Sequence, residues 1–142
     1  MSAPPISLAK DPPVPLSTEQ LLVPWLRAFL NVRAVTELPA NLATVTPIID
    51  VARIGGGSDD NNPSFEFPTV SIDCYAANVT DTMALAMRVD RAIRVNLPGQ
   101  PLANRAVVTR TDTISGPSFR PYDDLALRRF GATYRILIKQ PV

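Results

Sequence analysis

Histidine is absent from the 142-residue chain, which removes the side chain that enzymes use most often as a general base near neutral pH. Ser-His-Asp and Cys-His catalytic arrangements and histidine-based zinc sites are therefore impossible within it. Only two lysines occur, Lys10 and Lys139, both near the ends of the sequence, where a precise site is hard to build. Carboxylate chemistry remains open, but no two carboxylates have a suitable spacing on adjacent predicted elements. We therefore expect no enzymatic activity, no bound metal and no cofactor.

Cysteine is nearly absent as well. Cys74 is the single cysteine, so no disulfide can form within the chain, and a reducing compartment is a natural setting. Its place on the apolar side of a predicted strand indicates a buried, unreactive thiol. No apolar run reaches the roughly 18 residues of a membrane span, and the N-terminal segment lacks the charged-then-apolar pattern of a signal peptide. We therefore expect no membrane partner.

The chain also lacks an excess of either charge. Fourteen basic and 13 acidic residues give a net charge of +1, whereas general binders of nucleic acid or anionic membranes carry a basic excess. Twelve of the basic residues are arginines, whose planar guanidinium suits ion pairs at protein interfaces. Codon usage in a GC-rich genome would produce the same enrichment, so the arginines alone do not decide between these explanations.

What the sequence does contain is enough apolar material for one domain. A length of 142 residues with 46% hydrophobic residues is typical of a single core. Residues 1–16 hold five prolines (Pro4, Pro5, Pro12, Pro13 and Pro15), which predict an extended arm, either disordered or laid along a partner. Residues 17–142 form the predicted domain.

Hydrophobic periodicity predicts two helices and four strands in that domain. Ser17 and Gln20 have the spacing of a capping box, and Pro24 predicts a kink or restart in the first helix. The apolar stripe of the second helix comprises Leu85, Ala86, Val89, Ala92 and Ile93. The predicted elements are a helix at 17–32, strands at 45–54 and 67–76, a helix from Asn78 or Thr80 to Leu97, and strands at 105–115 and 129–139. This αββαββ order predicts an α+β fold, in which a four-stranded, mainly antiparallel sheet carries both helices on one face.

One face of the second predicted helix has a composition that is common at protein interfaces. Arg88, Arg91 and Arg94 lie three residues apart and outside the apolar stripe, with Met83 and Met87 beside them. A solvated helix face explains the pattern equally well. The arginines could alternatively line a passage for DNA, because backbone phosphates are bound without reading the bases.

Two long predicted hairpin loops are further candidates for contacts, because long loops in small domains are often functional. The candidate residues in these loops are Gly55, Gly56, Gly57, Asp59 and Asp60 in the first, and Phe119, Arg120 and Tyr122 in the second. The glycine loop has no lysine and Ser/Thr after its last glycine, so it is not a phosphate-binding loop. Asp59 and Asp60 on a flexible loop would be a weak site for a hard cation.

The sheet face away from the helices is predicted to be half polar and to be covered by another chain. Its residues would be Ser71, Asp73, Tyr75, Thr133, Arg135 and Leu137. An α+β domain that binds single-stranded nucleic acid stacks bases on paired exposed aromatic residues. Tyr75 is the one aromatic residue clearly on the outward side, which argues against such binding.

Several segments, taken in order over residues 17–140, resemble the tail terminator proteins of long-tailed bacteriophages. They are LVPWLRAFL, TELPANL, PIIDVARIGGG, VSIDCYAANVTDTMALAMRVDRAI and GPSFRPYDDLALRRFGATYRILI. The resemblance implies a structural virion protein at the junction of tail and neck, assembled in the cytoplasm of the host bacterium. It implies a ring, usually of six copies, that caps the tail tube protein, ends its polymerisation and joins the head–tail connector. Genomic DNA would pass through the lumen without sequence recognition.

Within this interpretation, the arginine and methionine face is a candidate for subunit contacts or for the lumen, and the two loops are candidates for contacts with tube or neck. A different ring-forming protein of the neck, such as a connector or stopper, fits the same features. The two functions differ in partner, because a terminator binds the tail tube protein and blocks its elongation.

Overall fold

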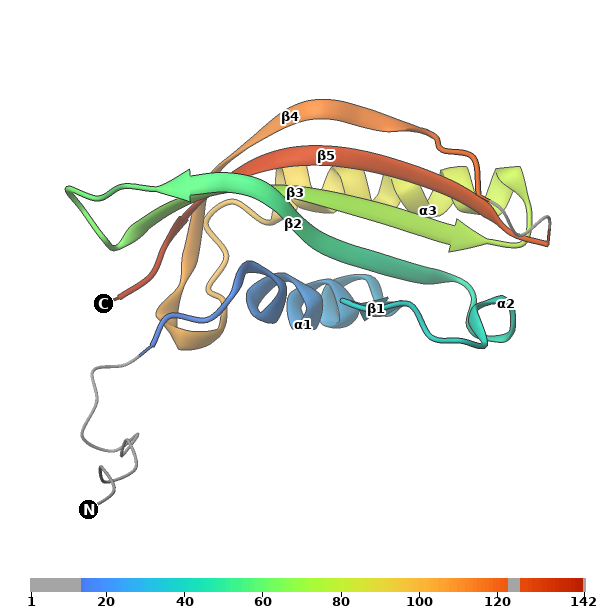
Figure 1. Ribbon diagram of the computed structural model, residues 1–142, viewed down its shortest axis with the longest axis horizontal. Coiled ribbons are helices and arrows are strands. Elements are labelled where there is room, and N and C mark those ends of the chain that lie inside the picture. Colours follow the sequence, from blue (N-terminus) through green and yellow to red (C-terminus); the bar gives the residue numbers. More distant parts are fainter. Residues whose placement is uncertain (1–13, 123–125, 142) are drawn as a thin grey trace, which may run out of the picture.

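The computed structural model describes residues 14–122 and 126–141. They form a single α+β unit in which one sheet is covered on one face by helices (Figure 1). The helices are α1 (Thr18–Leu30), α2 (Leu42–Val45) and α3 (Val79–Arg91), with a π-helical turn (Ala92–Asn96) and a 3-10 turn (Ala103–Arg105). The strands are β1 (Arg33–Val35), β2 (Ile48–Ser58), β3 (Phe65–Ala76), β4 (Val107–Phe119) and β5 (Arg128–Lys139).

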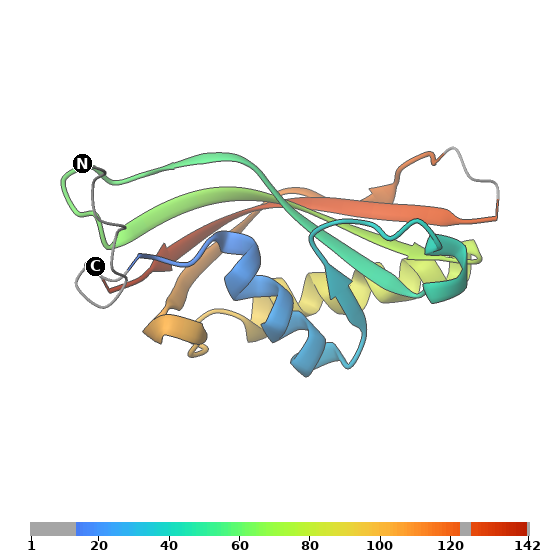
Figure 2. The same ribbon diagram turned by 60° about the horizontal axis from the view of Figure 1, so that its bottom comes forward.

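The sheet has five strands in the order β1-β2-β3-β5-β4, where the sequence predicted four. The β1–β2 pair is parallel and the other pairs are antiparallel. The additional strand, β1, comes from a segment that was predicted to be a connection. Three residues show no readable alternation, so this strand was not recognisable from sequence. Helices α1 and α3 lie on the same face of the sheet, as predicted (Figure 2).

Helix α1 begins with the predicted capping box, since the Ser17 hydroxyl accepts from the Gln20 N–H and the Gln20 side chain accepts from the Ser17 N–H. The helix is assigned as one element through Pro24, so the predicted restart does not occur. The core side of the helix is the row Thr18, Leu22, Leu26 and Leu30, together with Leu21 and Val23. Apolar periodicity in this segment would place Leu21, Leu22, Trp25, Ala28, Phe29 and Val32 on one core face, but Ala28 and Phe29 are exposed, so the helix is rotated away from that expectation.

Helix α3 follows the prediction closely. The Asn78 side chain accepts from the Asp81 N–H at 2.8 Å, which identifies Asn78 as the cap. All five residues of the predicted apolar stripe are buried. The π-helical turn continues the helix to Asn96, and Gly99 adopts a positive φ of 84° just after it, where glycine is favoured.

Strand β2 corrects the predicted glycine loop, because Gly55, Gly56 and Gly57 are paired with β3. A bulge at Ile54 shifts the register between Arg53 and Gly55. Pairing continues to Ser58, so the loop between the two strands is shortened to residues 59–64. Strand β4 likewise extends through Gly116 to Phe119, beyond the predicted end at 115, with three register shifts along its length.

The main core lies between the sheet and the two long helices. Cys74 is buried there, and burial raises the pKa of its thiol to about 12, which keeps it protonated as predicted. Tyr134 is also fully buried, and its hydroxyl donates to Asp90 on α3 at 2.6 Å. Burial, and then the Asp90 carboxylate, raise the pKa of Tyr134 well above its ordinary value.

A second, smaller cluster lies on the opposite face of the sheet. It contains Leu42, Ile48, Tyr75 and Leu127, with Val35, Leu38, Val45 and Tyr122 packed against it. Tyr75 is only 2% exposed. This chain therefore covers one end of the face that was predicted to be bare. Beyond that end Arg135 is exposed and Leu137 is half-buried.

Of the predicted N-terminal arm, residues 1–13 lie outside the described residues. Leu16 is held by Gln140, since the Leu16 N–H donates to Gln140 Oε1 at 2.9 Å and Gln140 Nε2 donates to the Leu16 carbonyl at 3.0 Å. The side chain of Gln140 is buried although it is polar, and these bonds explain how it is tolerated there. Within the described residues, no helix is long and apolar enough to span a membrane.

Candidate functional site

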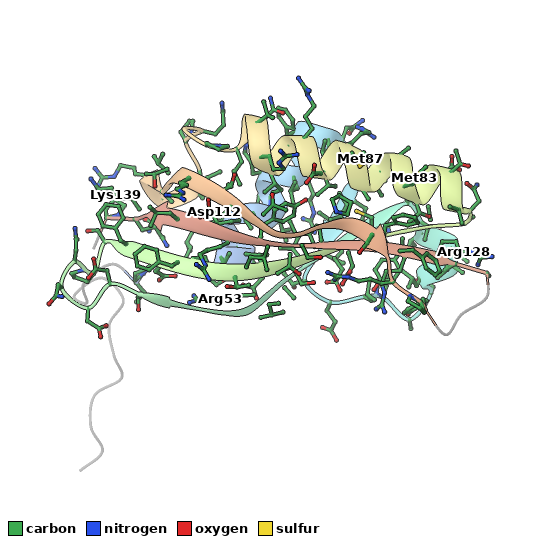
Figure 3. The ribbon with its side chains drawn as sticks, turned by 90° about the horizontal axis from the view of Figure 1, so that it is seen from above. Arg53, Met83, Met87, Asp112, Arg128 and Lys139 are labelled. Atoms are coloured by element: carbon green, nitrogen blue, oxygen red, sulfur yellow. The ribbon has the colours of Figure 1, made fainter. Side chains whose placement is uncertain are left out.

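The outer side of α3 carries a line of exposed apolar side chains. Met83 is 47% exposed, Met87 53% and Val95, in the π-helical turn, 58%. Figure 3 shows the two methionines next to each other along the helix. The apolar stripe of the same helix is already buried in the core, so this second line has nothing of its own chain to cover it among the described residues. Exposed apolar residues that run together are typical of interaction sites.

The three predicted arginines of this helix do not form a uniform row. Arg88 Nη2 donates to the carbonyl of Leu30 at 2.9 Å and thereby caps the end of α1. Arg94 pairs with Asp90 at 3.1 Å. Arg91 is exposed, and its guanidinium makes no ion pair or hydrogen bond with any described residue. Arg91 is therefore the arginine best placed to meet a group from another molecule.

The flank of the sheet opposite α3 is formed by the outer edge of β2 (Figure 3). Strand β1 pairs only with residues 48–50, so the edge from Val51 to Ser58 is open among the described residues. Ile54 lies at the bulge in this edge and is 60% exposed. An open edge with an apolar side chain is a surface on which a second chain can pack.

The β2–β3 connection projects at one end of the molecule (Figure 1). Asp59 Oδ1 accepts from the N–H groups of Asn61 and Asn62 at 3.0 and 3.2 Å, so this carboxylate shapes the turn. Asp60 is exposed beside it. Among the described residues, no group of three or more metal-ligating side chains comes together here or elsewhere.

The predicted loop residue Arg120 turns inward onto the second face of the sheet. Its guanidinium contacts Asp73 at 2.9 Å, Ser71 at 3.0 Å and Thr133 at 3.2 Å. This placement needs Gly131, because a Cβ at that position would overlap both the Asp73 carboxylate and the Arg120 guanidinium. Arg120 therefore fastens the β4–β5 connection to the sheet.

Tyr122 and Phe119 flank this arginine in different ways. The Tyr122 ring packs edge-on against Tyr75, with centroids 5.2 Å apart, and Arg129 lies 5.3 Å from its centroid. Tyr122 thus belongs to the small second cluster. Phe119 is 51% exposed and meets Phe130 edge-on at 5.8 Å, so a substantial part of its ring remains available at this end of the molecule.

A pair of carboxylates that the sequence analysis did not identify lies next to the Arg120 contacts. Asp50 lies opposite Asp73 in the β2–β3 register, and its Oδ1 atom is buried without a hydrogen-bond partner among the described residues. Burial, and then the Asp73 charge, raise the pKa of Asp50 from 3.8 to about 6, while Arg129 acts in the opposite direction. Asp50 and Asp73 are 23 positions apart and come together only through the pairing of β2 with β3. No local sequence pattern therefore predicts this pair.

Comparison with known proteins decides the family. The family described as "phage tail termination protein" matches residues 15–141. The chain belongs to the phage tail termination protein family. It matches none of the curated proteins with which it was compared. Among solved structures, a chain from the "Virion of native gene transfer agent (GTA) particle" is similar at 17% identity and a TM-score of 0.48, covering 80% of this chain and 84% of that chain.

As a tail termination protein, the chain is a structural protein of the phage tail, as the resemblance implied. One groove of about 310 Å³ lies between α3 and the start of β2, and its lining includes a single carboxylate, Asp81, and a single arginine, Arg88. The stacking of bases on Tyr75 is excluded, because that ring is buried.

Proposed function

We propose that this tail termination protein forms a closed ring of six copies, the number that the family resemblance implies. The ring caps the tail tube, ends its polymerisation and joins it to the connector of the neck. Genomic DNA passes through the lumen without sequence recognition. Membership of the family carries this proposal, and the surfaces of the molecule support it.

A ring needs two different surfaces that complement each other and lie on opposite flanks. The face of α3 with Met83, Met87 and Arg91 is one such surface. The open edge of β2 around Ile54 lies on the opposite flank (Figure 3). We assign the contact between neighbouring copies to these two surfaces. The edge strand β4 is less suited to pair with another strand, because its register is interrupted three times.

The two connections at the ends of the long axis are then free to contact the tube and the neck. The β2–β3 connection, with Asp59 and Asp60, lies at one end, and Phe119 leads into the β4–β5 connection at the other (Figure 1). With the lateral flanks used for the ring, these ends point toward its two rims. Gly55, Gly56 and Gly57 lie in the paired part of β2 that leads into the first connection, and Arg120 and Tyr122 hold the second on the sheet.

The ring is tested by blocking each flank separately. Arg91→Glu places a negative charge on the α3 face, and Ile54→Arg places a positive charge on the β2 edge; both residues are exposed, so the monomers should remain folded. In light scattering, each variant should give a mass below that of the ring. Arg110→Glu, a charge reversal at an exposed residue of β4 outside the two assigned surfaces, is the control and should keep the mass of the ring.

Mixing the two blocked variants tests the head-to-tail arrangement. In this experiment Met87→Arg replaces Arg91→Glu as the variant blocked on α3, so that both blocked surfaces are positive and cannot pair with each other. One copy keeps an intact β2 edge and the other an intact α3 face, so the mixture should form dimers and nothing larger. Unchanged ring mass for Arg91→Glu and Ile54→Arg would contradict the assignment of the flanks. Capping is tested by adding the protein to polymerising tail tube protein, whose elongation should stop. Binding to the connector alone, with unhindered elongation, would identify a stopper.

A further inference from the structure

Two aromatic rings on α1 remain at the surface. Trp25 is half-buried and Phe29 is 49% exposed, and the rings stack with their centroids 4.8 Å apart and their planes at 9°. Trp25 packs in part against the main core, whereas Phe29 lies outside both core clusters. A stacked pair of large aromatic rings leaves apolar area in water, which favours contact with another apolar group.

A groove of about 220 Å³ adjoins this pair. Its lining residues are Leu21, Pro24, Trp25, Pro101, Leu102 and Ala103. None of these residues is charged, and one of them is the aromatic residue Trp25. Grooves lined by aromatic residues and prolines bind proline-rich segments in the polyproline II conformation, because such a segment is already extended and loses little entropy on binding.

The chain contains such a segment. Residues 1–15 include the pairs Pro4-Pro5 and Pro12-Pro13, followed by Pro15. The segment joins the domain at Leu16, whose backbone is bound on both sides by Gln140. Asn104 donates to the same Gln140 oxygen at 3.2 Å and directly follows Ala103 in the groove lining. The arm therefore starts beside the groove in each copy.

We propose that the proline-rich arm, residues 1–13, binds in the Trp25 groove of the neighbouring copy in the ring. The groove of its own copy is disfavoured by direction. Gln140 fixes Leu16, and the described segment before it leads away from α1 (Figures 1 and 2). To enter the groove beside α1 of its own copy, the arm would therefore have to turn back at prolines, which restrict the backbone. An extended arm of 13 residues reaches roughly 40 Å, enough to span part of a neighbouring domain of this size.

This inference rests on the proposed ring. It gives the arm a function in assembly, which a single domain would not need. Each copy would hold the next through this arm in addition to the flank contact. Such a second attachment raises the effective concentration of neighbouring copies and so favours ring closure. The arm would act as a clasp between subunits.

Trp25 reports directly on this contact, because it is the single tryptophan of the chain. The full chain and a variant lacking residues 1–13 are compared by fluorescence at several concentrations, with the mass measured in parallel. In the full chain, Trp25 emission should move to shorter wavelength and resist acrylamide quenching as rings form. In the truncated variant it should stay at longer wavelength at every concentration. Replacing Pro4, Pro5, Pro12 and Pro13 with alanine keeps the arm length and should give the spectrum of the truncated variant.

A synthetic peptide of residues 1–13 is then added to the truncated variant and should restore the shorter-wavelength emission in a saturable manner. Rings with the same Trp25 emission in the full and truncated chains would overturn the clasp while leaving the ring intact. A shift that persists in diluted monomers would place the arm in its own groove and overturn the neighbour contact. If the ring does not form, the mass measurement shows this independently of the fluorescence. In that case, unchanged Trp25 emission on addition of the peptide would overturn the groove as a binding site.

Discussion

At the level of single residues, the second face of the sheet is organised around Gly131. Because this position has no side chain, Arg120 can lie flat over the sheet and reach Asp73, Ser71 and Thr133 together. The guanidinium offers several donors in fixed directions, which suits three acceptors on two strands. Asp50 is close to the same cluster, but its buried Oδ1 atom has no hydrogen-bond partner among the described residues.

Asp50→Asn should therefore stabilise the protein at neutral pH. The pKa of Asp50 is raised from 3.8 to about 6 in the folded protein, so the folded state binds more protons than the unfolded chain between these two values. The free energy of unfolding therefore falls as the pH rises through that window. The destabilisation by the ionised Asp50 carboxylate is fully present above pH 6. We expect a gain of roughly 1 kcal/mol at pH 7.5, discounted because Asp50 is partly exposed, or about 2–4 °C in Tm.

Thermal unfolding at pH 7.5 and pH 4 checks this expectation. The gain should largely disappear at pH 4, where the native carboxyl also carries its proton. Asp60→Asn is the matched control, because Asp60 is exposed on the β2–β3 connection and should change Tm little at either pH. An equal gain at both pH values would show that removal of the charge is not the cause.

At the level of elements, β2 shows how a strand continues through glycines. The bulge at Ile54 and the positive φ of 95° at Gly56 bring the backbone of β2 close to that of β3. A Cβ at Gly56 would overlap the Phe67 carbonyl oxygen and the backbone of Pro68. Glycine at this position is therefore required for close strand pairing and does not by itself indicate a loop.

Gly56→Ala should destabilise the outer part of the β2–β3 hairpin. The substitution forces a side chain into a left-handed conformation and into contact with the partner strand, which costs roughly 1–3 kcal/mol. Chemical denaturation measures the loss, and amide hydrogen exchange in residues 65–67 should accelerate. Gly57→Ala is the matched control, because a Cβ there meets no atom within 4 Å. Equal effects from both substitutions would contradict the role of the close approach.

At the level of the whole molecule, the arm and the domain meet at Leu16. The domain core lies between the sheet and helices α1 and α3, and the described residues before Leu16 lie outside the two core clusters. Val14 is 73% exposed. The N-terminal boundary of the folded unit is thus set by the Gln140 contact.

Removal of residues 1–13 should leave the monomer as stable as the full chain, with a Tm difference of about 2 °C or less, because Leu16 and its bonds to Gln140 remain. Removal of residues 1–16 is the contrasting variant. It leaves the buried Gln140 amide without these partners and should cost roughly 1–3 kcal/mol. Both are measured on diluted samples that contain monomers. A large loss for the shorter deletion would show that the arm is part of the folded core.

Local patterns in the sequence determined much of this protein. The cap at Ser17, the cap at Asn78 and the buried stripe of α3 depend on spacings of three or four residues, and β3 and β5 depend on alternation. Such signals are short-range and can be read directly from the chain. The absence of histidine likewise ruled out whole classes of catalytic site before any fold was known.

Only the tertiary structure decided the features that depend on contacts between distant residues. The parallel strand β1 forms because β2 lies beside it, and three residues carry no periodic signal of their own. Arg120 finds its acceptors 47 and 49 positions away, and Trp25 remains at the surface because the row from Thr18 to Leu30 packs inward. Strand register and helix rotation are set by the lowest free energy of the whole core. A sequence pattern narrows that choice but does not make it.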